Sequence, residues 1–203
     1  MRGWAIAMGS VCACMPPPMN VGYVAMNPSG CGGVDVQGQV GMGGALPSGP
    51  PNGGGAAHVE PFVTRRVSIP IGVGVGGGAA SDGFAPLRVG VRHRPLPFLA
   101  YGAGIGPSFV FDRAFFGTTG VADVELVLGL HRPCVGFSVG LRPALSFDAG
   151  GLAFYGLCDP SLAITLAPAL SLTLALPVGI YHLPVAGGVV PFMSGALGVH
   201  RRF

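Results

Sequence analysis

The chain has few charged residues and no lysine. Charged residues make up 9% of its 203 residues, where a soluble globular domain carries about 25%. The formal net charge is only +3, and no basic run is interleaved with aromatic residues, which excludes the footprint of a nucleic-acid-binding protein. So few charges do not cover the surface of a soluble protein, and we expect a different solvent around this chain.

CxxC pairs, which are typical of zinc sites and thioredoxin-like redox sites, are also absent. We therefore expect no metal and no cofactor. Glycine (37 residues) and proline (20) are abundant, as in some disordered chains. Disorder, however, requires low hydrophobicity and high charge, and half of these residues are apolar. The five cysteines are Cys12, Cys14, Cys31, Cys134 and Cys158.

Residues 1–13 resemble a secretory signal peptide, with one arginine, a short apolar run and small residues at its end. The sequence Val-Cys-Ala-Cys also resembles a lipobox, in which case Cys14 carries a lipid. A start codon assigned inside a longer signal is the other alternative. Residues 14–33 are rich in proline and glycine and are interpreted as a linker. The folded domain is expected over residues 34–203.

The stretch "SLAITLAPALSLTLALPVGI", residues 161–180, is uncharged and long enough for a transmembrane helix. Nine of its ten even positions are bulky, and none of the nine odd positions from 163 to 179 is. A period of two indicates strands, because a helix would spread both sets around its circumference. We expect two strands joined by a three-residue turn at 167–169, which pairs Leu166 with Leu170, Ile164 with Leu172 and Leu162 with Leu174.

The same alternation recurs along the chain and predicts an all-β protein. Pro61 interrupts one segment, so eight strands is the alternative to ten. The ten expected strands are residues 34–46, 57–65, 68–77, 84–93, 98–110, 119–130, 134–147, 155–166, 170–182 and 189–203.

Each expected strand has one apolar face and one face of mostly small residues with scattered charges. Lipid around an apolar exterior explains this composition, and only helices or closed barrels span a bilayer. We therefore predict a transmembrane antiparallel up-and-down β-barrel of about ten strands.

The two ends of this barrel differ in the sequence. Short turns alternate with longer connections such as "PSGPPNGGG" and "FDRAFFGTTG", and the longer ones are expected outside the cell. An aromatic girdle at the long-loop end is predicted from Phe109, Phe111, Phe115, Phe116, Phe147, Phe154, Tyr155 and Tyr181. A basic group suited to anionic lipid headgroups is predicted at the short-turn end, from Arg65, Arg66, His93, Arg94, His131, Arg132, His200, Arg201 and Arg202.

The chain ends in "PFMSGALGVHRRF", with Leu197, Val199 and the terminal aromatic Phe203 on alternate positions. This end, with the alternation over residues 34–203, resembles the small Gram-negative outer-membrane β-barrels. Arg201 departs from the family pattern, in which an aromatic or apolar residue is commoner at this position. The resemblance implies a bacterial outer-membrane location, contact with outer-membrane lipid, and recognition of the last strand by the barrel-assembly machinery, with Phe203 as its signal.

The alternation also predicts which charged residues face the lumen. Because three acids balance three arginines, one interpretation is a structural barrel held by a salt-bridge network. The other is a narrow passive pore for small hydrophilic solutes. The expected lumen residues are Asp35, Arg88, Arg92, Asp123, Glu125 and Arg142.

An enzyme is the alternative function, because barrels of this family include lipid- and peptide-hydrolysing enzymes with sites at the extracellular rim. Such a site needs a base with a nucleophile or an activated water. No local motif ties the candidates together, and we expect no enzymatic activity. The candidates near that rim are His58, His182, Asp82, Asp112 and Ser108.

Overall fold

The computed structural model describes residues 32–46, 52–78, 83–111, 116–148, 151–183 and 188–203. The segments interpreted as signal peptide and linker lie outside these residues, apart from Gly32 and Gly33. The described residues form twelve strands. They are β1 (Val34–Ala45), β2 (Asn52–Pro61), β3 (Val67–Ser68), β4 (Ile71–Gly78), β5 (Gly83–Leu96), β6 (Leu99–Phe111), β7 (Phe116–His131), β8 (Val135–Asp148), β9 (Gly151–Ala167), β10 (Leu170–Ala175), β11 (Val178–Leu183) and β12 (Gly188–Arg202).

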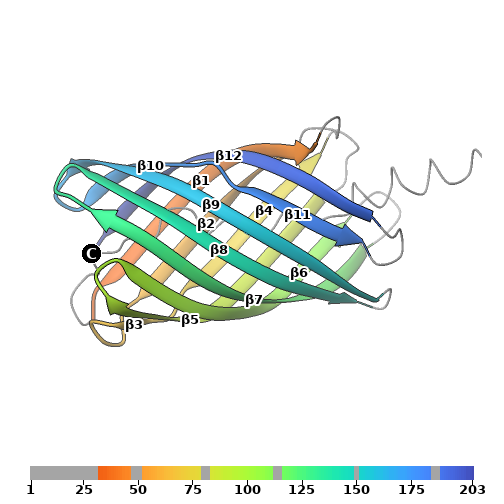
Figure 1. The fold of residues 1–203 in the computed structure, drawn as a ribbon, viewed down its shortest axis with the longest axis horizontal. Coiled ribbons are helices and arrows are strands. Elements are labelled where there is room, and N and C mark those ends of the chain that lie inside the picture. The colour runs from red at the N-terminus through yellow and green to blue at the C-terminus, as the bar shows by residue number, and fades with distance from the viewer. Residues whose placement is uncertain (1–31, 47–51, 79–82, 112–115, 149–150, 184–187) are drawn as a thin grey trace, which may run out of the picture.

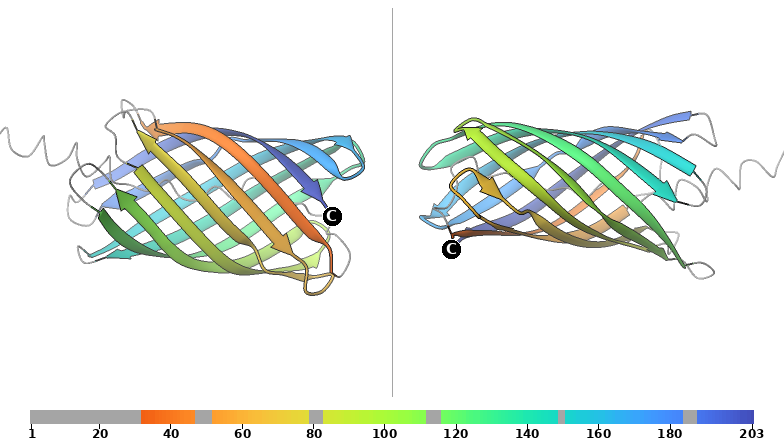
Figure 2. Two further views of the ribbon diagram at one scale, coloured as in Figure 1. Left: turned by 180° about the vertical axis from the view of Figure 1, so that it is seen from behind. Right: turned by 90° about the horizontal axis from the view of Figure 1, so that it is seen from below.

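The strands form one closed antiparallel barrel (Figures 1 and 2). Chain neighbours pair around the wall, and β12 pairs with β1, from Asp35↔Arg202 to Ala45↔Phe192, so none of the described wall strands is an edge strand. β3 and β4 together form one wall strand between β2 and β5, and β10 and β11 form another between β9 and β12. Twelve segments therefore make ten wall strands, which confirms the all-β barrel with ten strands and not eight.

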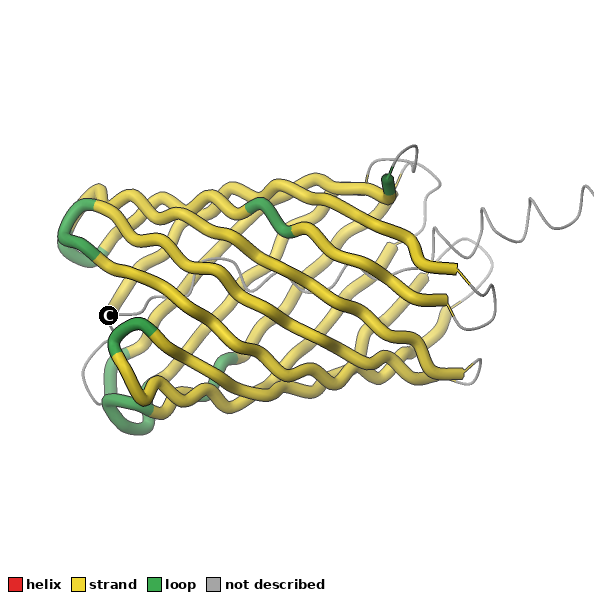
Figure 3. The backbone as a smooth tube through the Cα atoms, in the orientation of Figure 1, coloured by secondary structure: helices red, strands yellow, loops and turns green. Residues whose placement is uncertain are grey.

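Prolines cause both interruptions of the wall strands. Pro70 separates β3 from β4, and Pro177 separates β10 from β11, because proline has no backbone N–H to donate to a neighbouring strand. Their carbonyls still accept hydrogen bonds from the next strand, Gly90 N–H to Pro70 at 2.9 Å and Ser194 N–H to Pro177 at 2.8 Å. Figure 3 shows both breaks as short loop segments inside the wall.

The stretch over residues 161–180 folds as two strands that turn at Pro168. Ile164 pairs with Leu172 and Leu162 with Leu174, as the parity predicts. The expected Leu166–Leu170 pair is wrong, because the turn has two residues and Leu170 pairs with Ala167. A bulge between Leu170 and Ser171 restores the predicted register, so the bulky side chains stay on one face.

The second strand differs most from its expected bounds. β2 spans Asn52–Pro61 instead of 57–65, so a glycine-rich segment expected in a loop lies in the wall. Gly54 is required there, because a Cβ would lie 2.6 Å from the carbonyl oxygen of Val75. Several other segments expected in long loops also belong to strands, including residues 116–120 in β7. The connections at the two ends of the barrel therefore differ less in length than expected.

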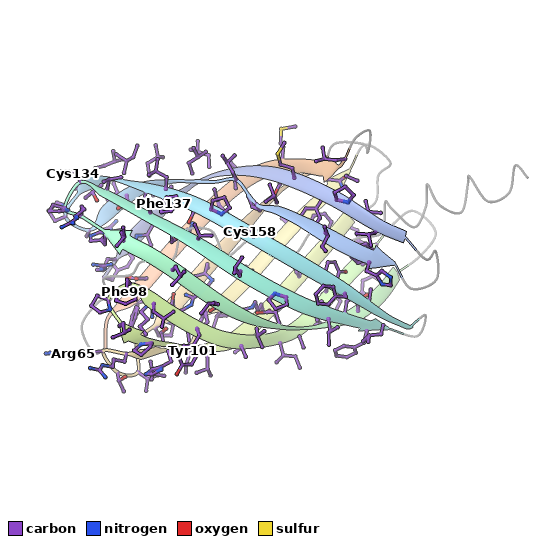
Figure 4. The ribbon with its side chains drawn as sticks, in the orientation of Figure 1. Arg65, Phe98, Tyr101, Cys134, Phe137 and Cys158 are labelled. Atoms are coloured by element: carbon purple, nitrogen blue, oxygen red, sulfur yellow. The ribbon has the colours of Figure 1, made fainter. Side chains whose placement is uncertain are left out.

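The outer surface of the barrel is apolar. Large aliphatic side chains cover its middle, and Val124, Leu128 and Leu141 are each about half exposed. Aromatic side chains lie toward both ends: Phe111, Phe116, Phe147 and Phe154 at one end, and Phe98, Tyr101, Phe137 and Phe203 at the other. Figure 4 shows Phe98, Tyr101 and Phe137 near the end that carries Arg65. This is the exterior of a barrel that spans a bilayer.

Two members of the predicted aromatic girdle are inside the barrel. Tyr155 and Tyr181 are 3% and 7% exposed, and their rings lie 4.5 Å apart between centroids. They pack with Ala144 in a small luminal core. The prediction placed both tyrosines at the correct end of the barrel but on the wrong face. Odd-numbered positions on β9 and β11 face the lumen. Phe115 lies outside the described residues.

Among the described residues there is no helix with the length and hydropathy needed to cross a bilayer.

Candidate functional site: the charged lumen

The six charged residues expected in the lumen are all buried inside the barrel. Their side chains come from four strands, β1, β5, β7 and β8, and all lie on the inward parity of those strands. Burial of so many charges is unfavourable unless each is paired and hydrogen-bonded. Their exposed fractions are 4% for Asp35, 5% for Arg88, 0% for Arg92, 8% for Asp123, 4% for Glu125 and 8% for Arg142.

Arg92 lies at the centre of the network. Its Nη1 donates to Oε2 of Glu60 at 2.5 Å, and its Nε donates to Oε1 of Glu125 at 2.6 Å. The two carboxylates come from β2 and β7, on either side of β5. One fully buried guanidinium therefore joins two wall strands that are not hydrogen-bonded to its own.

Arg88 binds Asp123 through two parallel hydrogen bonds. Its Nε lies 2.7 Å from Oδ2 and its Nη2 lies 2.6 Å from Oδ1, the bidentate geometry that makes arginine–carboxylate pairs strong. The pair reaches from β5 to β7 across β6, where Gly104 lies beneath it. A Cβ at Gly104 would lie 2.5 Å from Cζ of Arg88, so glycine makes room for the pair.

Arg142 extends the network to β8. Its Nη2 lies 3.5 Å from Oε2 of Glu125, and its Nε lies 3.9 Å from Oδ1 of Asp123. Asp123 and Glu125 of β7 therefore lie between the arginines of β5 and Arg142 of β8. Charges far apart in the sequence form one continuous cluster over β2, β5, β7 and β8.

Sequence reasoning missed Glu60 and Arg94 as members of this cluster. Arg94 Nη2 donates to Oε1 of Glu60 at 2.7 Å, and its Nη1 donates to Oγ of Ser68 at 2.8 Å. The Ser68 hydroxyl also bonds to Glu60. Arg94 was expected in the exposed basic group, but it is 3% exposed. The signal was present, because Arg94 shares the even parity of Arg88 and Arg92 on one strand.

Asp35 belongs to a second group of polar side chains at the seam where the barrel closes. Its carboxylate lies 3.6 Å from Nε2 of His200 and 3.3 Å from Nε of Arg202, both on β12. His200 is also buried, at 6% exposure, so it is not one of the solvent-facing basic residues expected at this end. Gln37 reaches Thr173 on β10 at 3.4 Å. Polar contacts therefore tie the first strand to the last two.

The candidate catalytic residues are not brought together. His58 lies in the charged lumen, 3.6 Å from Glu60, and not at the expected rim, because β2 begins earlier than expected. Ser108 is buried on β6 between Pro86 and Thr119, and His182 is exposed on β11. Asp82 and Asp112 lie outside the described residues. Within the described part of the chain, no group of three metal-binding side chains is found.

Comparisons with known proteins find only distant structural likenesses. No protein-family model and no curated protein matches the sequence. A bacterial polysaccharide outer membrane secretin is 11% identical over 75% of this chain, with a TM-score of 0.45, and the chain spans 57% of its length. The translocator domain of the autotransporter NalP from Neisseria meningitidis is 14% identical, with a TM-score of 0.36 and coverage of 100% of this chain and 95% of that one. A loop-deletion variant of OmpT, an outer membrane protein of Vibrio cholerae, is 8% identical, with a TM-score of 0.37 and coverage of 85% and 100%.

The structure itself carries the assignment of the chain. Its sheet is closed, so no strand edge is left unpaired in the wall. Its outside is apolar between two aromatic belts, and the charged side chains of its lumen are enclosed. A closed barrel of this kind satisfies its backbone hydrogen bonds without water, which a bilayer requires. The sheet and its two surfaces are those of a β-barrel that spans a membrane.

Proposed function

We propose that this chain is a non-enzymatic structural barrel of the Gram-negative outer membrane, with a lumen closed to hydrated solutes by the charged cluster. The observation that carries this proposal is the burial of the cluster: the side chain of Arg92 is 0% exposed and that of Glu125 is 1% exposed. A water-filled channel would leave such groups hydrated. The side chain of Arg88 also fills the space above Gly104 on β6, which would otherwise widen the lumen.

Conductance tests the closed lumen. The full chain in planar lipid bilayers is expected to give no stepwise conductance at the noise level of the recording. The double variant Arg88→Ala/Asp123→Ala removes both partners of one pair and so leaves no new unpaired partner in that pair. We expect it to admit ions, whereas truncation of two turn residues, Arg65→Ala/Arg132→Ala, leaves the barrel silent. Reproducible steps from the unmodified chain would instead establish a narrow passive pore.

We propose that the last strand and Phe203 form the signal read by the barrel-assembly machinery. Phe203 is 63% exposed, and its backbone pairs with Val34 through two hydrogen bonds, at 2.9 and 3.2 Å. The guanidinium of Arg201 lies 4.7 Å from the Phe203 ring centroid, so the arginine that departs from the family pattern covers the aromatic signal.

The variant Phe203→Ser is expected to lose most of its folded, heat-modifiable form in the outer membrane, measured by gel migration without boiling. The matched control is Phe137→Ser, which removes an outward-facing phenylalanine of similar exposure, 47%, from the same end of the barrel. Equal yields of the two variants would show that Phe203 has no special role. Refolding of purified Phe203→Ser into detergent is expected to match the unmodified chain, because the defect lies in recognition.

A further inference from the structure

The lumen has two halves of different chemistry: one half holds the charged cluster, and the other is lined by small, apolar and uncharged polar side chains such as Phe84, Val190 and Ser108. Along β5 the inward side chains change from Arg94, Arg92 and Arg88 to Pro86 and Phe84. Along β1 they change from Asp35, Gln37 and Gln39 to Gly41, Gly43 and Ala45. The change happens at the same level on strands that are far apart in sequence but close in the wall.

A cavity of about 160 Å³ lies in this apolar half. Its wall includes Ala56, Phe84, Leu157, Val190 and Phe192, with glycines of β1, β2 and β4 between them. Gln39, Asn52 and Ser194 supply the polar side chains, and no charged side chain of the described residues lines it. An enclosed apolar cavity of about 150 Å³ takes up a molecule of the size of benzene, so the space here is large enough for part of a hydrocarbon chain.

We propose that this cavity binds an uncharged hydrocarbon chain, with the charged cluster as its floor. The lining offers contact to methylene groups and no charged partner for an ionic ligand. A polar solute would lose its hydration there without replacement hydrogen bonds. The charged cluster limits how deep the hydrocarbon enters the lumen, because a hydrocarbon makes no favourable contact with ion pairs. Free hydrocarbons and the acyl chains of membrane lipids share this chemistry.

Magnetic resonance distinguishes these occupants on the full chain in lipid nanodiscs. Val189 and Val190 are adjacent on β12, but Val189 faces outward, with 58% exposure, and Val190 lines the cavity. In chain-deuterated lipid with added protonated decane, we expect nuclear Overhauser effects from decane to the methyls of Val190 and Leu157. In protonated lipid without decane, the same effects at these two methyls would identify the lipid acyl chain as the occupant.

A matched pair of variants places the hydrocarbon in the cavity. Ala56→Phe adds a ring of about the cavity's size and is expected to abolish the effects at Val190 and Leu157 while those at Val189 remain. Ala57→Phe places the same ring on the outer face and is expected to change neither. Retention of the luminal effects in folded Ala56→Phe would overturn the proposal. The proposal would also be overturned if Val190 and Leu157 of the unmodified chain showed nuclear Overhauser effects from water and none from hydrocarbon. This measurement needs no variant to fold.

Discussion

Replacement of Arg92 by methionine is expected to lower the free energy of unfolding by about 3–5 kcal/mol, the cost of removing one partner from a buried ion pair. Arg92 is 0% exposed and bonds to Glu60 and Glu125 at once. Methionine fills much of the same volume but leaves two carboxylates without their shared guanidinium. Urea titration of the barrel in lipid vesicles, followed by circular dichroism and by gel migration without boiling, measures the change.

Two further variants test the cause of this loss. Arg65→Met removes an arginine from an exposed turn and is expected to change the stability by no more than about 0.5 kcal/mol. Arg92→Met combined with Glu125→Gln removes one charge of each sign, leaves Glu60 bonded to Arg94 and Asp123 bonded to Arg88, and is expected to recover part of the loss. If Arg92→Met were as stable as the unmodified chain, the charged cluster would not hold the barrel wall together.

Arginine at the middle of the outer wall is expected to be the second most damaging change. Val124 is near the middle of β7 and 54% exposed, and its neighbours on the outer face are apolar. Val124→Arg is expected to cost about 2–4 kcal/mol, because a guanidinium at the bilayer midplane loses its hydration. The same urea titration in lipid vesicles measures this cost.

The matched control lies on the same strand and the same face. Leu130 is one residue from the end of β7, with 66% exposure, and Leu130→Arg is expected to cost at most about 1 kcal/mol near the interface. The difference between the two variants reports depth in the membrane. Equal costs at Val124 and Leu130 would contradict the placement of this face in lipid.

Much of the fold follows from the alternation of side chains. The period of two over residues 161–180 predicts two strands with their leucines outward, and the structure places Ile164, Leu174 and Ile180 on the outer surface. The register was also predictable in part, because only an odd-length connection, or a shorter turn with a bulge, keeps the bulky residues on one face. The bounds of β2 were not predictable. Its glycines are typical of a loop sequence, but in the structure they let β2 and β4 lie close together.

The sequence predicted which charged residues line the lumen but not which of them form ion pairs with one another. The parity of β5 identifies Arg88, Arg92 and Arg94 as neighbours on one face. Glu60 was missed because Pro61 made the bounds of its strand uncertain. His58 was assigned to the wrong end of the barrel because the same strand was expected to begin at residue 57. A misplaced strand boundary moves every residue of that strand along the barrel axis, which is why β2 accounts for both errors.

The sequence by itself determined the two surfaces of this protein, since a period of two depends only on local backbone geometry and on the solvent that each face meets. It therefore determined that the barrel wall is apolar outside and carries most of its charges inside. Only the tertiary structure decided that Arg92 joins Glu60 to Glu125 and that the far half of the lumen contains an uncharged cavity. Both depend on the order and stagger of strands around the closed wall, which local patterning does not encode.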